Sequence, residues 1–260
     1  MHFLINKKEG QTPLEVLEQL RREKSIDSVV PMTYAGRLDP MAEGLLLLLV
    51  GDECKKKEQY LGLDKEYEIE VLLGVGSDTG DVLGRVEMKS MAGSNFYEEV
   101  IHKEVIHEKL SQLVGERIEK YPAFSSKPIN GKPMFTHAKE GSLDRFAIDE
   151  IPEKLIEIYS IDFISQQKIS IEELIKTAIE RISKVKGDFR QNEIIESWQS
   201  LKGSNKDSNE FSIIKIHVKS SSGAYMRTLA QKLGESLGTQ ALAWKIKRTK
   251  IGEYNLEATS

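Results

Sequence analysis

"YAGRLDPMAEGLLLLLVG", residues 34–51, places one aspartate, Asp39, between a leucine and a proline and just ahead of a run of leucines. The apolar run from Leu45 to Val50 is typical of a strand that is buried on both faces. Pro40 disfavours helical geometry for the residue before it, so we expect Asp39 to be extended at the end of this strand. The stretch therefore predicts one carboxylate held rigidly at the rim of a buried sheet.

The residues around Asp39 leave two interpretations open. In the first, the carboxylate is structural: it forms an Asx turn, or it caps a helix that has Pro40 at its first position. Ala42 provides no carboxylate or amide to complete a capping box, and Gly44 follows early, which argues against a helix. In the second interpretation the carboxylate is presented for chemistry.

Capping residues and periodicity predict an α+β fold with a mixed, mostly antiparallel central sheet and flanking helices. A capping box that begins at Thr12 starts the first helix. Its expected buried stripe consists of Leu14, Leu17 and Leu20. The other expected elements are strands at 67–73 and 211–219 and helices at 170–187 and 225–238.

The composition is that of an ordinary globular protein, with 260 residues of which 39% are hydrophobic and 30% charged, and we expect residues 1–260 to form a single domain. Cys54 is the only cysteine, and the N-terminus is too polar for a signal peptide. The histidines have no partner at metal-ligand spacing. These features predict a cytoplasmic protein with no membrane anchor and no bound metal.

The net charge of −4 argues against a nucleic-acid partner, but the charges are unevenly distributed. Residues 211–251 contain eight lysines and arginines and a single acid, Glu235. Such a segment is either a phosphate-binding face or a solvated basic surface, and charge alone leaves both open.

Two further features invite a functional interpretation. The glycine-rich segment "GVGSDTGDVLG", residues 74–84, lacks the Gly-Lys-Ser/Thr ending of a phosphate-binding loop and the acid spacing of a calcium loop, so a turn is favoured. Arg227 lies at the start of an expected helix, where its charge opposes the helix dipole. We therefore expect Arg227 to have an anionic partner, which is either a carboxylate or a phosphate.

Four segments, taken in order, resemble the TruB-type tRNA pseudouridine synthases, which convert uridine 55 in the T-loop. These segments are "YAGRLDPMAEGLLLLLVG", "KEYEIEVLLGVGSDTGDVLG", "YPAFSSKPINGKPMFTHAKEG" and "SSGAYMRTLAQKLGESLGTQALAWKIKRTKIG". They extend from Tyr34 to Gly252, and "INKKEGQTPLEVLEQLRR" is similar to the family's opening. The resemblance implies the pseudouridine synthase fold.

The resemblance also implies a catalytic set. Asp39 falls at the position of the nucleophile, Tyr67 at that of the active-site tyrosine and Arg227 at that of the arginine that pairs with the nucleophile. Ile246 falls where the family usually has a leucine lining the uracil pocket. Tyr67 is expected to stack on the uracil and help move the C5 proton. The reaction is expected to need no metal and no organic cofactor.

The implied partner is the T-loop and T-arm of tRNA, from which the target base must be flipped out. We expect Lys245, Lys247 and Arg248, together with Lys250, to hold the RNA backbone. Asp81 and Lys132 are further substrate-binding candidates. Nothing in the mixture of charges indicates an obligate dimer, so a monomer is expected.

The sequence departs from the family's pattern at further places, and the family's "Tyr-Ser-Ala-x-Lys" appears as "FSSKP", with its lysine one residue early at Lys127. Tyr34 stands where the family usually has a histidine that helps fill the place of the flipped base, and we expect Tyr34 to stack there instead. Residues 165–210 form a longer insertion than usual. The family's C-terminal RNA-binding domain of the PUA type is missing from the 260 residues, so we expect weaker or narrower RNA binding.

Two alternatives remain on the same scaffold. "GRLD" followed by "EGLLLL" is also similar to synthases that modify ribosomal RNA, although the later segments favour the TruB type. A non-catalytic RNA-binding or RNA-folding protein is the other alternative. Binding alone does not require a rigid nucleophile, so the presence of Asp39, Tyr67 and Arg227 argues against it.

Overall fold

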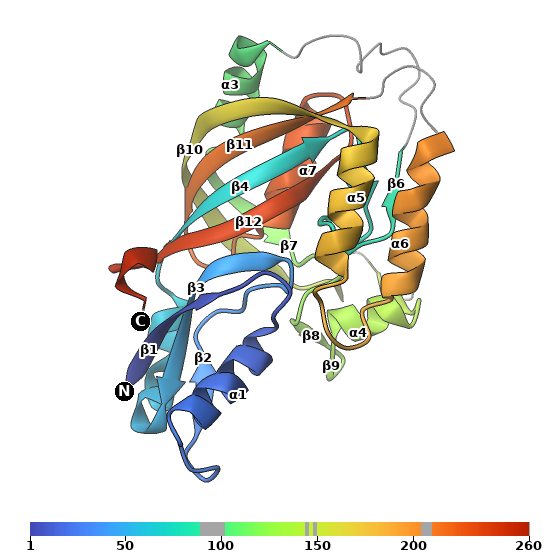
Figure 1. Cartoon of the computed structure of the whole chain (residues 1–260). Coiled ribbons are helices and arrows are strands. Elements are labelled where there is room, and N and C mark those ends of the chain that lie inside the picture. Colours follow the sequence, from blue (N-terminus) through green and yellow to red (C-terminus); the bar gives the residue numbers. More distant parts are fainter. Residues whose placement is uncertain (89–101, 144–145, 148–149, 204–209, 260) are drawn as a thin grey trace.

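The computed structural model describes residues 1–88, 102–143, 146–147, 150–203 and 210–259 (Figure 1). One long, twisted sheet organises this part of the chain. Its strands lie in the order β1 (His2–Lys7), β3 (Ala42–Val50), β12 (Ala241–Ile251), β4 (Lys65–Leu73), β11 (Glu210–Ser220), β10 (Glu153–Ser170) and β7 (Gly115–Lys120). Two short strands pair with it outside this order, β2 (Met32–Tyr34) with β3 and β13 (Tyr254–Asn255) with β12.

Among the described strands of this sheet, β12 and β3 pair in parallel and every other neighbouring pair is antiparallel. The predicted mixed, mostly antiparallel sheet is confirmed. The smaller elements are α2 (Lys57–Leu61), α3 (Lys103–Gln112), α4 (Met134–Lys139), and the two-stranded pairs β5 (Gly76–Ser77) with β6 (Val86–Glu87) and β8 (Pro128–Ile129) with β9 (Lys132–Pro133). The described helices are all too short or too polar to span a bilayer.

The leucine run forms β3 and is buried on both faces, as predicted. Leu46 and Leu48 pack into the main core with helix α1 (Pro13–Glu23), whereas Leu45, Leu47 and Leu49 pack with Ile251 in a small second cluster. Successive side chains of a strand point to opposite faces of the sheet. A strand that is buried on both faces therefore needs an apolar residue at every position. The loop that carries Asp39 therefore ends on one of the most enclosed strands of the molecule.

Helix α1 begins with the predicted capping box. The backbone N–H of Glu15 donates to Thr12 Oγ1 at 3.2 Å, and the N–H of Thr12 donates to the Glu15 carboxylate at 2.7 Å. The buried face consists of Val16, Leu17 and Leu20, together with Pro13. The prediction that Leu14 belongs to this face was wrong, because Leu14 points to solvent and is 59% exposed.

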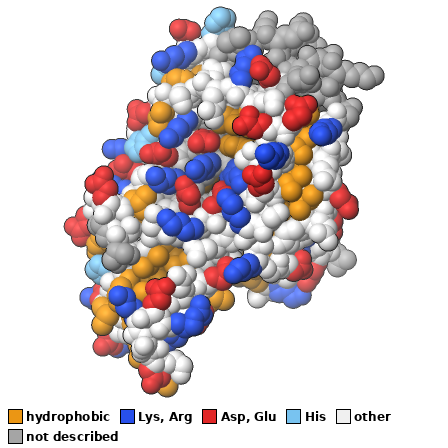
Figure 2. All heavy atoms as spheres, in the orientation of Figure 1, with side chains coloured by type: hydrophobic (Ala, Val, Ile, Leu, Met, Phe, Trp, Pro, Cys, Tyr) orange, Lys and Arg blue, Asp and Glu red, His pale blue; other side chains and the backbone are white. Residues whose placement is uncertain are grey.

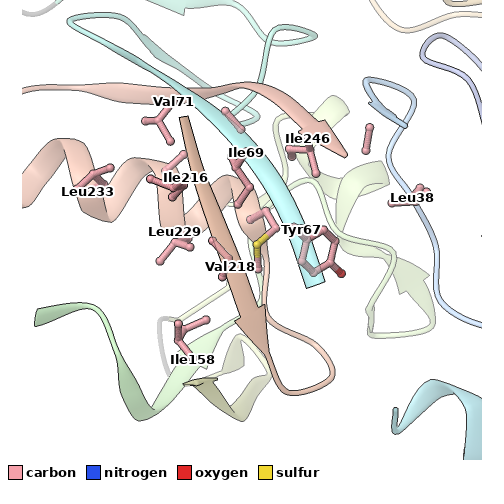
Figure 3. Packing of buried hydrophobic residues seen from close by; sticks show 14 of the residues in the cluster. Leu38, Tyr67, Ile69, Val71, Ile158, Ile216, Val218, Leu229, Leu233 and Ile246 are labelled. Atoms are coloured by element: carbon pink, nitrogen blue, oxygen red, sulfur yellow. The ribbon is translucent and has the colours of Figure 1, made fainter. Parts of the chain in front are cut away.

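The inner face of the sheet packs on α7 (Met226–Ser236), which lies behind the strands in Figure 1. Figure 3 shows side chains of β4 and β11 meeting Leu229 and Leu233 of this helix. The strand residues of that layer are Tyr67, Ile69, Val71, Ile216 and Val218. Because alternate residues face opposite ways, Glu66, Glu68 and Glu70 of β4 lie on the outer face.

Helices α5 (Ile171–Ile182) and α6 (Gln191–Ser200) cover one end of the outer face (Figure 1). They belong to the predicted insertion at 165–210, of which 204–209 lie outside the described residues. Trp198 of α6 is fully buried and meets Trp244 of β12 edge to face, with ring centroids 5.9 Å apart. The insertion thus adds a further hydrophobic core, separate from the two clusters that meet on β3.

Candidate active site

Asp39 lies in the loop between β2 and β3, three residues before β3 begins. Its backbone carbonyl accepts a hydrogen bond from the N–H of Ala42 at 3.0 Å, which closes a tight turn. The neighbouring carbonyl of Pro40 is held by the N–H of Gly10 at 2.9 Å and by the buried ammonium of Lys7 at 3.3 Å. The turn is therefore structural, while the carboxylate itself is 39% exposed and faces solvent.

Arg227, in the first turn of α7, meets the Asp39 carboxylate. Its Nε lies 2.8 Å from Asp39 Oδ2 and 3.8 Å from Asp81 Oδ2. The Nε–H bond does not point at a carboxylate oxygen, so the contact is an ion pair rather than an aligned hydrogen bond. The terminal nitrogens donate to the carbonyls of Thr79 at 2.5 Å and Phe124 at 3.1 Å. Arg227 thus ties the loop that carries Asp39 to two other loops.

The charges around Arg227 explain how a cation is tolerated at a helix N-terminus. Burial alone lowers the pKa of the guanidinium, but the carboxylates of Asp39 and Asp81 outweigh burial and raise that pKa. Burial, together with the nearby charge of Asp39, raises the pKa of Asp81 above its ordinary value although Arg227 opposes this. One buried cation is therefore shared by two carboxylates, of which only Asp39 reaches solvent.

Asp81 is fixed by its own turn in the glycine-rich segment. Its Oδ1 accepts hydrogen bonds from Thr79 Oγ1 at 2.8 Å and from the N–H of Leu83 at 2.9 Å. Gly80, between these residues, has a φ of +77°, and a Cβ there would lie 3.2 Å from Arg227 Cβ. The segment is thus a turn, as favoured from its pattern, and the turn brings Asp81 against Arg227.

Tyr67 and Ile246 form an apolar wall beside this cluster. Ile246 pairs with Ala42 of β3 on one side and with Ile69 of β4 on the other. Tyr67 and Ile246 belong to the same core cluster as Leu38, the residue before Asp39. In Figure 3 the Tyr67 hydroxyl points away from α7 and toward the loop that carries Leu38. The arrangement offers an exposed carboxylate, anchored on a buried cation, at the edge of an apolar surface.

Comparison with models of known protein families identifies the family of this chain. The profile described as TruB family pseudouridylate synthase (N terminal domain) matches residues 24–180, more than half of the chain. The chain belongs to the TruB family of pseudouridine synthases. The matched residues include Asp39, Tyr67 and Asp81.

Curated relatives from several bacteria agree with this membership. A tRNA pseudouridine synthase B from Borreliella afzelii (strain PKo) is 29% identical over 255 residues, which cover 98% of this chain and 71% of the relative. A tRNA pseudouridine synthase B from Aromatoleum aromaticum (strain DSM 19018 / LMG 30748 / EbN1) is 28% identical over 98% of this chain and 64% of the relative. The corresponding protein of Desulfotalea psychrophila (strain LSv54 / DSM 12343) is also 28% identical, with 83% of its length covered.

A solved structure shares the fold. A chain in the crystal structure of a Cbf5-Nop10-Gar1 complex aligns with a TM-score of 0.56 and 15% identity, covering 98% of this chain. This TruB-family chain spans about half of that solved chain, 49% of its length. The likeness supports the pseudouridine synthase fold that the motifs implied.

The remaining predicted residues of this TruB-family protein lie in different surroundings. Tyr34, on β2, is half-buried against the main core, and the guanidinium of Arg37 lies 5.6 Å from its ring centroid. Lys132 is exposed on the β8–β9 hairpin, where its ammonium lies 3.9 Å from the Glu140 carboxylate. The hairpin belongs to the segment that begins near Phe124, whose carbonyl holds Arg227.

The predicted basic face is not a basic face in the structure. Figure 2 shows positive and negative side chains interspersed over the outer face of the sheet. Lys245 pairs with Glu43 at 3.4 Å. Lys247 and Lys245 line an open hollow of about 160 Å³ together with Glu43, Glu68, Glu70 and Lys215. Because side chains alternate along β12, these lysines lie on the side opposite Ile246 and the active-site cluster.

Arg248 is a clearer correction. Its side chain is buried, and the guanidinium donates to the backbone carbonyls of Leu45 at 2.8 Å, Gly36 at 3.2 Å and Arg37 at 3.3 Å. The prediction that Arg248 holds an RNA phosphate was wrong, because its donors are committed inside the protein.

Two residues of the site were missed from sequence. Tyr225 occupies the N-cap position of α7 without a side-chain capping hydrogen bond, and its ring centroid lies 5.8 Å from the Arg227 guanidinium carbon. Burial, and then the charge of Asp39, raises the pKa of Tyr225 to about 12. Lys7 is fully buried beside the loop that carries Asp39, and burial lowers its pKa to about 8. A lysine at the end of a mostly apolar strand was the available signal for Lys7.

Proposed function

We propose that this TruB-family protein isomerises the uridine at position 55 in the T-loop of tRNA to pseudouridine, with Asp39 as the nucleophile. The observation that carries the proposal is the 2.8 Å ion pair between Asp39 and the buried Arg227, at the edge of the wall formed by Tyr67 and Ile246. Membership of the TruB family and the names of the curated relatives support the reaction class and the tRNA substrate.

The chemistry is a balanced rearrangement. The bond between N1 of the base and C1′ of the ribose breaks, and a bond between C5 and C1′ forms. The proton on C5 is lost and N1 regains one, so the product is an isomer and no oxidant or second substrate is consumed. An ionised carboxylate suits this task because it forms a transient covalent bond and then leaves again.

Each side chain of the site has a distinct role in this proposal. Arg227 orients the Asp39 carboxylate by lying against it from a buried position. Tyr67 stacks on the flipped uracil, and its hydroxyl relays the C5 proton. Ile246 packs against the other edge of the base. Asp81 contributes a second, buried carboxylate beside the Arg227 guanidinium.

RNA recognition is assigned to residues on the side of the site. Tyr34, with Arg37 over its ring, offers an aromatic surface for an unpaired base. Lys132, on the exposed hairpin, offers a cation for a phosphate. Flipping the target uridine costs a few kcal/mol, which contacts in the pocket must offset.

The test is to incubate the protein with unmodified tRNA transcripts and to map pseudouridine at nucleotide resolution. The proposal predicts a signal at position 55 that is absent from a transcript carrying cytidine there. A signal at another tRNA position, or in ribosomal RNA but not in tRNA, would redirect the assignment to that substrate. Binding of tRNA without any conversion would support a non-catalytic RNA-binding protein.

A further inference from the structure

Arg248 is a buried cation that the proposed chemistry does not use. Its three carbonyl contacts fall on two parts of one segment: Gly36 and Arg37 lie just before Asp39, and Leu45 lies in β3. Burial lowers the pKa of Arg248, and the electrostatic interaction of its guanidinium with the nearby Tyr67 side chain offsets part of that fall. One guanidinium thus touches both the nucleophile loop and the active-site tyrosine.

The position of Arg248 follows from strand register. On β12, Arg248 lies opposite Gly44 of β3 in the parallel pair and opposite Tyr67 of β4 in the antiparallel pair. Gly44 permits this close approach, because a Cβ at that residue would lie 2.2 Å from the carbonyl oxygen of Arg248. Arg248 is therefore placed between the strand that follows the nucleophile and the strand that carries Tyr67.

The chemistry of a guanidinium fixes the direction of its contact with Tyr67. Arg248 lies opposite Tyr67 in the strand register, and arginine has N–H donors and no acceptor, so in a contact between the two side chains the Tyr67 oxygen is the acceptor. The hydroxyl proton of Tyr67 is then left to point elsewhere, and the ring is held in one orientation. Two N–H groups are already committed to carbonyls of the Asp39 loop and a third to Leu45 of β3, so movement of the loop and movement of the tyrosine are coupled through one planar group.

We propose that Arg248 is a positioning residue, which aligns the Tyr67 hydroxyl with the Asp39 loop and keeps that hydroxyl free to donate toward the flipped uracil. The inference rests on the proposed function, because it assumes that Tyr67 moves the C5 proton. It predicts an effect on the chemical step rather than on tRNA affinity. A purely structural Arg248 would change the stability of the fold and leave the rate per folded molecule unchanged.

The test uses single-turnover conversion of tRNA by excess protein, with the tRNA dissociation constant measured for each variant. Arg248→Lys keeps the charge but cannot bind three carbonyls and a phenol at once. We expect its rate to fall about 10²-fold, the scale of a misplaced acid–base group, with affinity unchanged within about threefold. Tyr67→Phe should lose a similar factor, and the double variant should lose little more than Tyr67→Phe alone, because the two residues act through one hydroxyl.

Lys65 provides the matched control. It is a second buried cation on β4, and its ammonium donates to the carbonyls of Leu61 and Leu63, away from the nucleophile loop. Lys65→Gln is expected to lower the melting temperature and leave the single-turnover rate within about threefold. The single-turnover rate is normalised to the fraction of protein that binds tRNA, so partial unfolding of a variant does not lower the measured rate. If Arg248→Lys does not fold, Arg248→Gln replaces it in the same cycle.

Two results would overturn the inference while leaving the proposed function intact. One is an Arg248 variant that converts tRNA at the wild-type rate. The other is a double variant in which the two losses multiply, since Arg248 would then act independently of Tyr67. A wild-type protein that converts no tRNA would instead overturn the proposed function.

Discussion

Arg227 is the residue on which the geometry of the site depends. Its guanidinium lies against two carboxylates and donates to two backbone carbonyls from different loops, and its side chain is only 4% exposed. A buried charge of this kind is stable only while all its partners remain in place. The pairing therefore holds Asp39 in one orientation without enclosing it, which is what a nucleophile that meets a flipped base requires.

Replacing this arginine by lysine tests that role. Arg227→Lys retains a positive charge, but a single ammonium cannot donate to the Thr79 and Phe124 carbonyls while it contacts Asp39. We expect the single-turnover rate to fall on the order of 10²-fold or more, with tRNA affinity nearly unchanged. The control is Lys232→Arg on the same helix, which exchanges the same two residue types. Lys232 pairs with Glu119. A rate for Arg227→Lys equal to that of the control would contradict the role.

At the scale of elements, β12 shows why a basic sequence need not make a basic surface. The eight cations of residues 211–251 were counted along the chain, but a strand divides successive side chains between two faces. Lys245 and Lys247 lie on the outer face, beside glutamates of the neighbouring strands. Arg248 lies on the inner face and is buried. The number of cations in a segment does not predict which of them are neutralised, because the glutamate partners lie on β3 and β4, far away in the sequence.

The salt dependence of tRNA binding distinguishes the two sides of the sheet. Lys132→Ala removes an exposed cation from the hairpin on the side of the site, and we expect it to reduce the slope of log affinity against log salt by about one. Lys247→Ala, on the outer face, is expected to leave that slope unchanged. The reverse pattern would show that RNA binds across the outer face after all.

The insertion can be tested as an element too. Trp198 of α6 is fully buried, and its indole N–H donates to the carbonyl of Val82 at 3.2 Å. Trp198→Ala should lower the free energy of unfolding by about 3–5 kcal/mol, because it leaves a large cavity between α6 and the sheet. Trp198→Phe should cost much less. Urea denaturation measures both, and a separate early transition would contradict the expected single domain.

For the whole molecule, local rules predicted most of the framework. The leucine run, the capping box at Thr12 and the alternation in β4 and β11 each gave an element of the observed sheet or its helices. These signals depend on neighbours in sequence. Asp39, Asp81 and Arg227 come from three segments that are distant in sequence. The position of Arg227 at a helix start predicted an anionic partner but did not predict which one. Resemblance to a family supplied the pairing with Asp39.

Buried cations were the feature that sequence rules did not anticipate. Lys7, Lys65 and Arg248 are buried, and each donates to backbone carbonyls of loops rather than to a carboxylate. Hydrophobic periodicity assigns every charged residue to the solvent-facing side of an element. It therefore cannot identify a buried cation that donates hydrogen bonds to backbone carbonyls. Lys7 and Arg248 hold the loop that carries Asp39, whereas Lys65 holds the turn before β4.

The buried lysine at position 7 predicts how stability responds to pH. Its pKa is about 8 in the folded protein and 10.5 when unfolded, so between these values the unfolded chain binds more protons. The free energy of unfolding of wild type should therefore rise relative to Lys7→Gln as pH increases, by about 2 kcal/mol between pH 7.5 and 9.5. Urea denaturation of both proteins at the two pH values measures this. An equal response in both would show that Lys7 is not titrating there.

The central claim is that Asp39 is the nucleophile that rearranges the uridine, and release of the C5 proton tests it most directly. A tRNA transcript labelled with tritium at C5 of its uridines is incubated with excess protein, and tritium in the water is counted. Asp39→Asn keeps the size of the side chain but cannot act as an anionic nucleophile. The account predicts release of about one equivalent per tRNA by wild type and none above background by Asp39→Asn, although both bind tRNA. Release by Asp39→Asn at the wild-type rate would contradict it.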